Sequence, residues 1–167
     1  WLTDPNPNCQ QGNYAYCERL RVTQLRSQNV TSFFWANNER IVFETGGDQL
    51  NDMTGFIDSI GIYAVNKDGT KAKQLVEPTD ALTNHKVIST IPIHRLPEDP
   101  EHILVMRNDR KRYYLDVYRM NIYTGKFFRV LAQPGPVTNW AVDNNGVVRM
   151  ATMQDENSLS YETQIMY

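Results

Sequence analysis

The feature that most restricts the fold of this chain is a strand–turn–strand unit that occurs twice. Residues 61–78 read GIYAVNKDGTKAKQLVEP, and residues 116–134 read DVYRMNIYTGKFFRVLAQP. Each unit has an apolar run containing Tyr, a turn that passes through Asn and ends at Gly69 or Gly125, and a second run that closes on Pro. Glycine can take the positive φ that a tight hairpin turn requires. Each unit therefore predicts two adjacent antiparallel strands.

A second phrase is also repeated, and each copy contains a tryptophan. Residues 32–43 read SFFWANNERIVF and residues 138–150 read TNWAVDNNGVVRM, so an Asn-rich corner follows both Trp35 and Trp140. The corner after Trp140 ends in Gly146, which marks a further hairpin turn. Because a large aromatic side chain that enters a strand usually belongs to the core, we expect both tryptophans to fill the space between adjacent sheets.

The rest of the chain shows short apolar runs or strict alternation, which is typical of strands, and almost no helical periodicity. Residues 113–121, YYLDVYRMN, alternate most clearly: Tyr118 and Met120 are expected on one face, Leu115 and Val117 on the other. Further strand candidates are residues 60–65, 73–76, 87–93, 102–106, 127–131, 137–142, 147–153 and 161–167. The sequence therefore predicts an all-β fold.

The order of these units is typical of a β-propeller, whose blades are four-stranded antiparallel sheets of about 40–50 residues. We expect residues 1–29 to supply the closing strands of one blade, residues 30–78 and 79–134 to form two blades, and residues 135–167 to begin another. Because a propeller closes with roughly four to eight blades, the sequence predicts a partial propeller. Its open faces and unpaired edges would favour self-association.

Composition places the chain among ordinary globular proteins and excludes some function classes. Hydrophobic residues make up 41%, charged residues 22%, and the formal net charge is −2, which argues against a nucleic-acid surface. Residues 107–112, RNDRKR, are a local basic exception, and their Asn-Asp pair predicts a solvated hairpin tip. No run approaches the ~18 apolar residues of a membrane helix, so no membrane span is predicted.

Residue spacing assigns no cofactor and no metal site. His85, His94 and His102 fall in separate predicted strands or loops, so a convergent set of metal ligands is not indicated. The acidic stretch 44–52, ETGGDQLND, lacks the alternating carboxylates of an EF-hand calcium loop and is interpreted as a polar loop. Substrate-binding residues stay unassigned.

Cys9 and Cys17 lie in one polar stretch, where a local loop could join them in a disulfide; two free thiols are the alternative. The chain begins with Trp1 and has no leader pattern, so we expect that processing or cloning removed whatever preceded it. The compartment stays open, with the periplasm or the cell exterior slightly favoured over the cytoplasm.

Four phrases in order resemble the N-terminal propeller of the prolyl oligopeptidase family of serine peptidases, particularly its bacterial members. They read FFWANNERIVFETGGDQ, GIYAVNKDGTKAKQLVEP, DVYRMNIYTGKFFRVL and PGPVTNWAVDNNGVVRMA, and the match spans residues 30 to about 153. The resemblance implies a propeller that covers a C-terminal α/β-hydrolase domain and restricts entry to short peptides, while a downstream Ser, Asp and His carry out acyl transfer. Residues 1–29 match little of the family's pattern.

The catalytic half that the resemblance implies is absent from this sequence. The nucleophile elbow G-x-S-x-G occurs nowhere, and no β-α alternation exists to build a hydrolase sheet. We therefore expect a non-catalytic segment whose partners are the remaining blades, the hydrolase domain and, through the complete enzyme, a peptide substrate. The alternatives are a non-enzymatic propeller scaffold for protein partners, similar to TolB, and, more weakly, a propeller glycosidase.

Overall fold

The computed structural model describes most of the chain between residues 21 and 165. The described ranges are 21–23, 25, 29–46, 61–78, 88–111, 114–133, 135, 137–154 and 161–165. Cys9, Cys17, His85 and most of residues 1–29 lie outside the described residues, so the predicted disulfide and the closing strands predicted for residues 1–29 are not tested.

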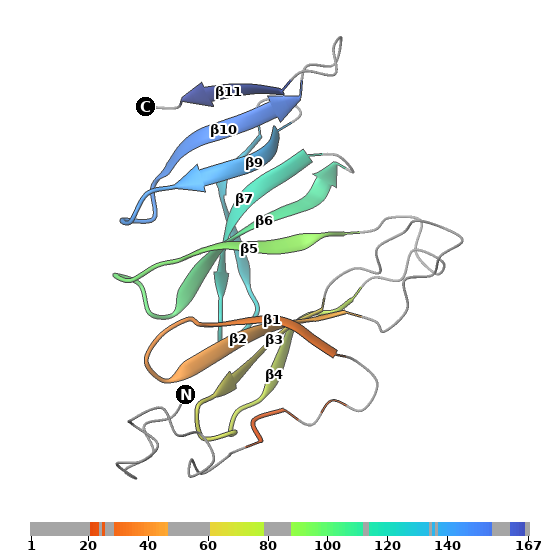
Figure 1. The fold of residues 1–167 in the computed structure, drawn as a ribbon, viewed down its shortest axis with the longest axis vertical. Helices are drawn as coiled ribbons and strands as arrows, with labels where there is room; N and C mark the ends of the chain where they lie inside the picture. Colours follow the sequence, from red (N-terminus) through yellow and green to blue (C-terminus); the bar gives the residue numbers. More distant parts are fainter. Residues whose placement is uncertain are drawn as a thin grey trace, which may run out of the picture.

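Eleven strands in the described part of the chain form three antiparallel sheets that follow one another along the sequence (Figure 1). Sheet I contains β1 (Asn29–Trp35), β2 (Arg40–Gly46), β3 (Gly61–Asn66) and β4 (Lys73–Val76). Sheet II contains β5 (Thr90–Arg95), β6 (His102–Lys111), β7 (Tyr114–Asn121) and β8 (Phe127–Leu131). Sheet III contains β9 (Val137–Val142), β10 (Val148–Gln154) and β11 (Tyr161–Ile165).

The strand order in each sheet is the order in the sequence, and no sheet closes on itself among the described residues. The described residues contain no helix, so the predicted all-β class is confirmed. Short apolar runs locate the strands well: β4, β8 and β9 have the bounds that the sequence predicts. Sheets I and II are four-stranded and are connected throughout by antiparallel pairing.

Sheet II lies between the other two sheets and buries both of its faces (Figure 1). Tyr118 and Met120 of β7 pack in the cluster shared with sheet I, whereas Val117 and the half-buried Leu115 pack in the cluster shared with sheet III. This is the division that strand alternation predicts. The first junction also contains Val42, Ile62, Ala64, Ile103 and Val105, and the second contains Leu104, Met106, Val137, Trp140 and Ala151.

The basic run at residues 107–112 differs from its predicted structure. The Asn-Asp pair is not a solvated turn, because β6 continues through it to Lys111. Asn108 is only 6% exposed, and its side-chain oxygen accepts a hydrogen bond of 2.6 Å from the backbone N–H of Ser89. A polar residue with a turn preference therefore stays in a strand, since a distant backbone group satisfies its side chain.

Three hairpin glycines have the positive φ that the sequence predicts: 80° at Gly69, 76° at Gly125 and 79° at Gly146. The turn at Gly125 also presses against sheet I, because a Cβ there would lie 2.9 Å from the carbonyl oxygen of Leu75. A Cβ at Gly69 would have the carbonyl oxygen of Arg21 as its nearest neighbour, 3.9 Å away. Glycine is thus needed at Gly125 for two reasons, conformation and close approach.

Arg40 crosses the first junction and is 1% exposed. Its guanidinium donates hydrogen bonds to the carbonyl oxygens of Ile122 at 2.8 Å and Lys71 at 3.2 Å, and to Asn66 Oδ1 at 2.7 Å. It also lies over the ring of Tyr123, 4.8 Å from the centroid. Burial lowers the pKa of Arg40, but the ordinary value is so high that the group stays charged. One buried cation therefore joins sheet I to the end of β7.

Replacing two of the turn glycines by alanine should separate conformational strain from close packing. A Cβ at Gly69 makes only ordinary van der Waals contacts. Gly69→Ala should therefore lower the free energy of unfolding only by the strain of a left-handed conformation, about 1 kcal/mol. Gly125→Ala must in addition displace backbone of sheet I, so we expect a loss of about 2–4 kcal/mol. Urea unfolding followed by tryptophan fluorescence measures both; equal losses would show that the contact with Leu75 is unimportant.

Arg40→Met should lower the free energy of unfolding by about 3 kcal/mol, because each hydrogen bond to a charged group contributes roughly 1.5–3 kcal/mol and buried acceptors lose their donor. Arg149→Met is the matched control, since Arg149 is an exposed arginine paired with Asp143, and it should change stability by less than about 1 kcal/mol. The same urea titration compares them. Similar effects of the two substitutions would contradict a role for Arg40 at the junction.

Candidate functional site

A cavity of about 580 Å³, here called the junction pocket, lies between the first strands of sheets I and II. All three sheets contribute to it, the third through the turn between β9 and β10. Its lining residues are Ser32, Phe34, Glu44, Pro92, Ile93, His94, Arg95, Pro97 and Asn144. The volume falls in the range of roughly 300–1,000 Å³ that is typical of sites for small ligands.

Both first strands are irregular where they line the junction pocket. The β1–β2 register shifts between Val30 and Ser32, and the β5–β6 register shifts between Pro92 and His94. Such bulges redirect side chains and are frequent beside binding sites. Proline is tolerated because β5 is an edge strand. As a result, four consecutive residues of β5 line the cavity, although strict alternation would turn every second one away.

The polar groups of the junction pocket are few and differ in charge. Ser32 Oγ donates a hydrogen bond of 2.8 Å to the Glu44 carboxylate. The side chain of Arg95 is exposed and has no hydrogen bond or ion pair within the described residues. His94 Nδ1 is covered from solvent and has no hydrogen-bond partner among the described residues. The pocket can therefore offer a carboxylate, a guanidinium and an imidazole to a bound molecule.

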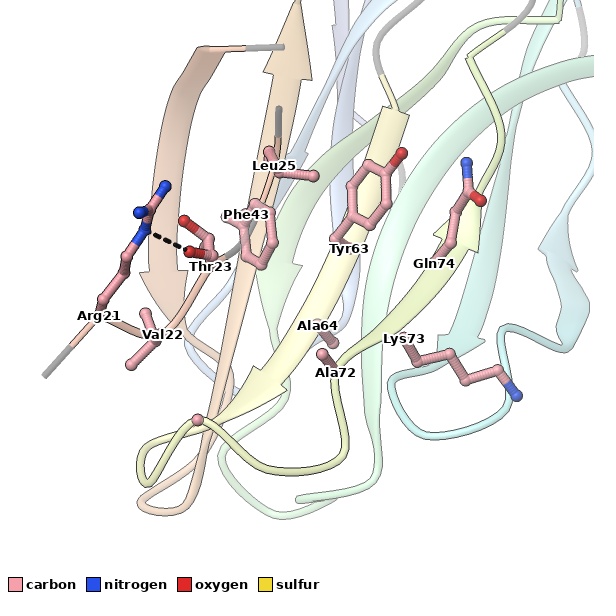
Figure 2. A pocket seen from close by; sticks show the side chains of 11 residues that line it. Arg21, Val22, Thr23, Leu25, Phe43, Tyr63, Ala64, Ala72, Lys73 and Gln74 are labelled. Atoms are coloured by element: carbon pink, nitrogen blue, oxygen red, sulfur yellow. Dashed lines mark hydrogen bonds between the residues drawn. The ribbon is translucent and has the colours of Figure 1, made fainter. Parts of the chain in front are cut away.

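A second cavity of about 430 Å³ lies on the face of sheet I that points away from sheet II (Figure 2). The rings of Phe43 and Tyr63 stack there with centroids 5.5 Å apart and planes 11° apart. Val22 and Leu25, from the segment before β1, also line this cavity. Phe33 pairs with Phe43 across β1 and β2, so its side chain is on the same face, and it is 70% exposed. This face of sheet I is thus aromatic and partly open.

The two tryptophans lie on corresponding faces of their sheets but in different surroundings. Trp140 is 4% exposed, packs between sheets II and III, and donates a hydrogen bond of 2.8 Å from Nε1 to the Leu115 carbonyl. Trp35 is half-buried at the end of β1. Its register partner Ile41 places it on the same face as Phe43, away from sheet II. Trp140 therefore fills a space between sheets, whereas Trp35 belongs to the aromatic face.

The described histidines are not brought together. His94 lines the junction pocket, whereas His102 bonds through Nδ1 to the Asp99 carboxylate at 2.9 Å. The described residues contain no group of three or more His, Cys, Asp or Glu side chains that could hold a metal ion. Of the carboxylates in the acidic stretch 44–52, only that of Glu44 lies within the described residues.

Sequence reasoning missed the most buried carboxylate of sheet II, that of Asp116, whose side chain is fully covered. Arg110 donates two hydrogen bonds to it, at 2.8 and 2.9 Å, and the backbone N–H of Gln133 donates a third at 2.8 Å. Burial opposes the ionisation of Asp116, but these donors outweigh it and hold its pKa below the usual range. The sequence does contain a sign of this buried carboxylate: an Asp stands between apolar strand residues, close in sequence to four cations.

The chain has no match among family models, curated proteins or solved structures. No helix in the described ranges is long and apolar enough to cross a bilayer.

Asp116→Asn should lower the free energy of unfolding at pH 7 by about 3 kcal/mol, because it leaves Arg110 without its buried partner. The native pKa of Asp116 is below the unfolded value of about 3.9, so its contribution is complete above that pH and is lost as pH falls through the native pKa. The difference between wild type and variant should therefore shrink below about pH 4. Urea titrations at pH 7 and pH 3 measure this.

Glu39→Gln is the control for that experiment. Glu39 forms an exposed ion pair with Lys67, and exposed pairs contribute at most about 1 kcal/mol. A difference between wild type and Asp116→Asn that stays constant with pH would show that the native carboxyl of Asp116 has no lowered pKa.

Proposed function

We propose that this chain is an arc of a β-propeller and the non-catalytic part of a serine peptidase that resembles the prolyl oligopeptidase family. In this role it restricts the access of peptides to an α/β-hydrolase domain. The proposal is supported by the succession of sheets I and II, which have the same strand order, and by the face-to-face packing of sheet I on sheet II and of sheet II on sheet III. Radial repetition of four-stranded antiparallel sheets is the construction principle of a propeller.

The observation that carries the proposal is a contact repeated from one sheet to the next. The last hairpin of sheet II, at Gly125, approaches Leu75 in the last strand of sheet I. The last hairpin of sheet I, at Gly69, faces the backbone of Arg21 and Val22 less closely: a Cβ at Gly69 would lie 3.9 Å from the Arg21 carbonyl oxygen and 4.0 Å from the Val22 Cα. Residues 21–22 are not part of a strand, but their place beside this hairpin supports a preceding neighbour of sheet I. In a propeller, the last hairpin of each blade is expected to face the preceding blade in this manner.

The position of the junction pocket also fits this role. In a propeller the blades surround a central channel, and we assign β1, β5 and β9 to the channel side. The junction pocket lies between β1 and β5, beside the turn that follows β9. A peptide that passes through the channel would therefore meet its side chains. Self-association through open blade faces and unpaired edges stays a prediction of the same proposal.

The test uses the complete polypeptide that contains this chain. A fluorophosphonate should label one serine outside residues 1–167, and cleavage should decline with peptide length. Trp140→Ala loosens the packing between sheets II and III, so it should raise kcat/KM for a long peptide relative to a short one by about tenfold, which corresponds to ~1.4 kcal/mol. Phe128→Ala, at an exposed side chain of β8, should leave that ratio unchanged.

Two results would overturn the proposal. Labelling of a serine within residues 1–167 would place the chemistry in this chain. A complete polypeptide without a reactive serine would instead favour the non-enzymatic scaffold, in which the propeller serves to bind protein partners.

A further inference from the structure

The junction pocket brings two opposite charges to one cavity without joining them. Among the described residues, the Glu44 carboxylate is bonded only to the Ser32 hydroxyl, and the Arg95 guanidinium has no polar partner. No ion pair connects Glu44 to Arg95, although both line the cavity. A molecule that carries both charges could satisfy each of them at once, and charge-assisted hydrogen bonds are the strong ones.

The remaining walls of the junction pocket are largely apolar. Phe34 extends from β1, Ile93 and Pro92 come from β5, and Pro97 follows β5. Apolar walls with a small number of placed polar groups are typical of small-molecule sites, in which the walls provide affinity and the polar groups fix orientation. A ligand that suits this cavity therefore has an apolar side chain beside its charged groups.

His94 is a further sign of a binding site. Its Nδ1 atom is covered and lacks a hydrogen-bond partner in the described structure, whereas almost all buried polar atoms in folded proteins have one. The strand irregularity between Pro92 and His94 places this ring at the cavity. A bound ligand would explain the missing hydrogen bond of His94, because it could reorient the imidazole ring and supply the partner of Nδ1.

We propose that the junction pocket binds a small zwitterion with an apolar side chain, the chemistry shared by free amino acids and short peptides. The ammonium group lies against Glu44, the carboxylate group lies against Arg95, and the side chain packs on Phe34 and Ile93. Ser32 holds the Glu44 carboxylate in place through its hydrogen bond. This inference does not rest on the proposed function, because it requires neither a hydrolase domain nor a closed propeller.

The test is isothermal titration calorimetry of the 167-residue chain with four probes. Leucine and leucyl-leucine carry both charges, N-acetyl-leucine lacks the ammonium group, and leucinamide lacks the carboxylate. We expect one of the two zwitterions to bind, with each blocked probe weaker by about tenfold or more. Tighter binding of leucine identifies a free amino acid as the ligand class, and tighter binding of leucyl-leucine identifies a short peptide.

Two variants assign the charges. Glu44→Gln should lower the affinity for leucine by about tenfold and leave the affinity for N-acetyl-leucine unchanged. Arg95→Gln should also lower the affinity for leucine by about tenfold but leave the affinity for leucinamide unchanged. Glu39→Gln and Arg149→Gln, exposed charges outside the pocket, are the matched controls and should bind like wild type. Unchanged urea midpoints of the variants show that the fold is intact.

The inference is overturned if neither zwitterion binds, if the blocked probes bind equally well, or if both pocket variants bind leucine like wild type. A failure to find a reactive serine in the complete polypeptide would leave these titrations unaffected. The two proposals can therefore fail separately.

Discussion

The burial of sheet II on both faces is the constraint on which the other sheets depend. Fully buried aliphatic side chains such as Ile103 and Val117 each contribute about 1.5–3 kcal/mol relative to exposure, and each lies at a different junction. At each junction, one polar side chain also forms a hydrogen bond from the neighbouring sheet to sheet II. Arg40 of sheet I donates to the carbonyl that follows β7, and Trp140 of sheet III donates to a carbonyl near its start. The strand β7 is thus held from two sides, at opposite ends.

Local sequence signals predict the hairpins because their causes are local. Gly69, Gly125 and Gly146 each take a positive φ in a turn whose neighbours in sequence are its neighbours in space. Apolar alternation likewise divides β7 between two cores, since the pleat alone determines which side chains share a face. These signals give the strands and the all-β class, but they do not give the partners of a polar side chain.

The basic run and the candidate site illustrate what a sequence pattern leaves out. Asn108 stays in a strand because Ser89 satisfies it, and Arg110 is fixed because Asp116 is buried beside it. The junction pocket depends on the pairing register of β5 with β6, which sets the irregularity after Pro92. Glu44 and Arg95 come from different sheets. Only the stacking of those sheets makes them neighbours of one cavity.

The junction pocket is consequently a property of the stacking and not of one sheet. Gly146 shows how the pocket depends on the packing between sheets II and III. A Cβ at that position would collide with the side chain of Leu96, next to Pro97 of the pocket wall. The absence of a side chain lets the β9–β10 turn approach the loop after β5, and this approach places Asn144 at the cavity. A ligand that bridges Glu44 of sheet I and Arg95 of sheet II would stabilise the arrangement of these two sheets through its own binding free energy. With such a ligand, packing between sheets I and II and occupancy of the pocket would be thermodynamically linked, and each would respond to a change in the other.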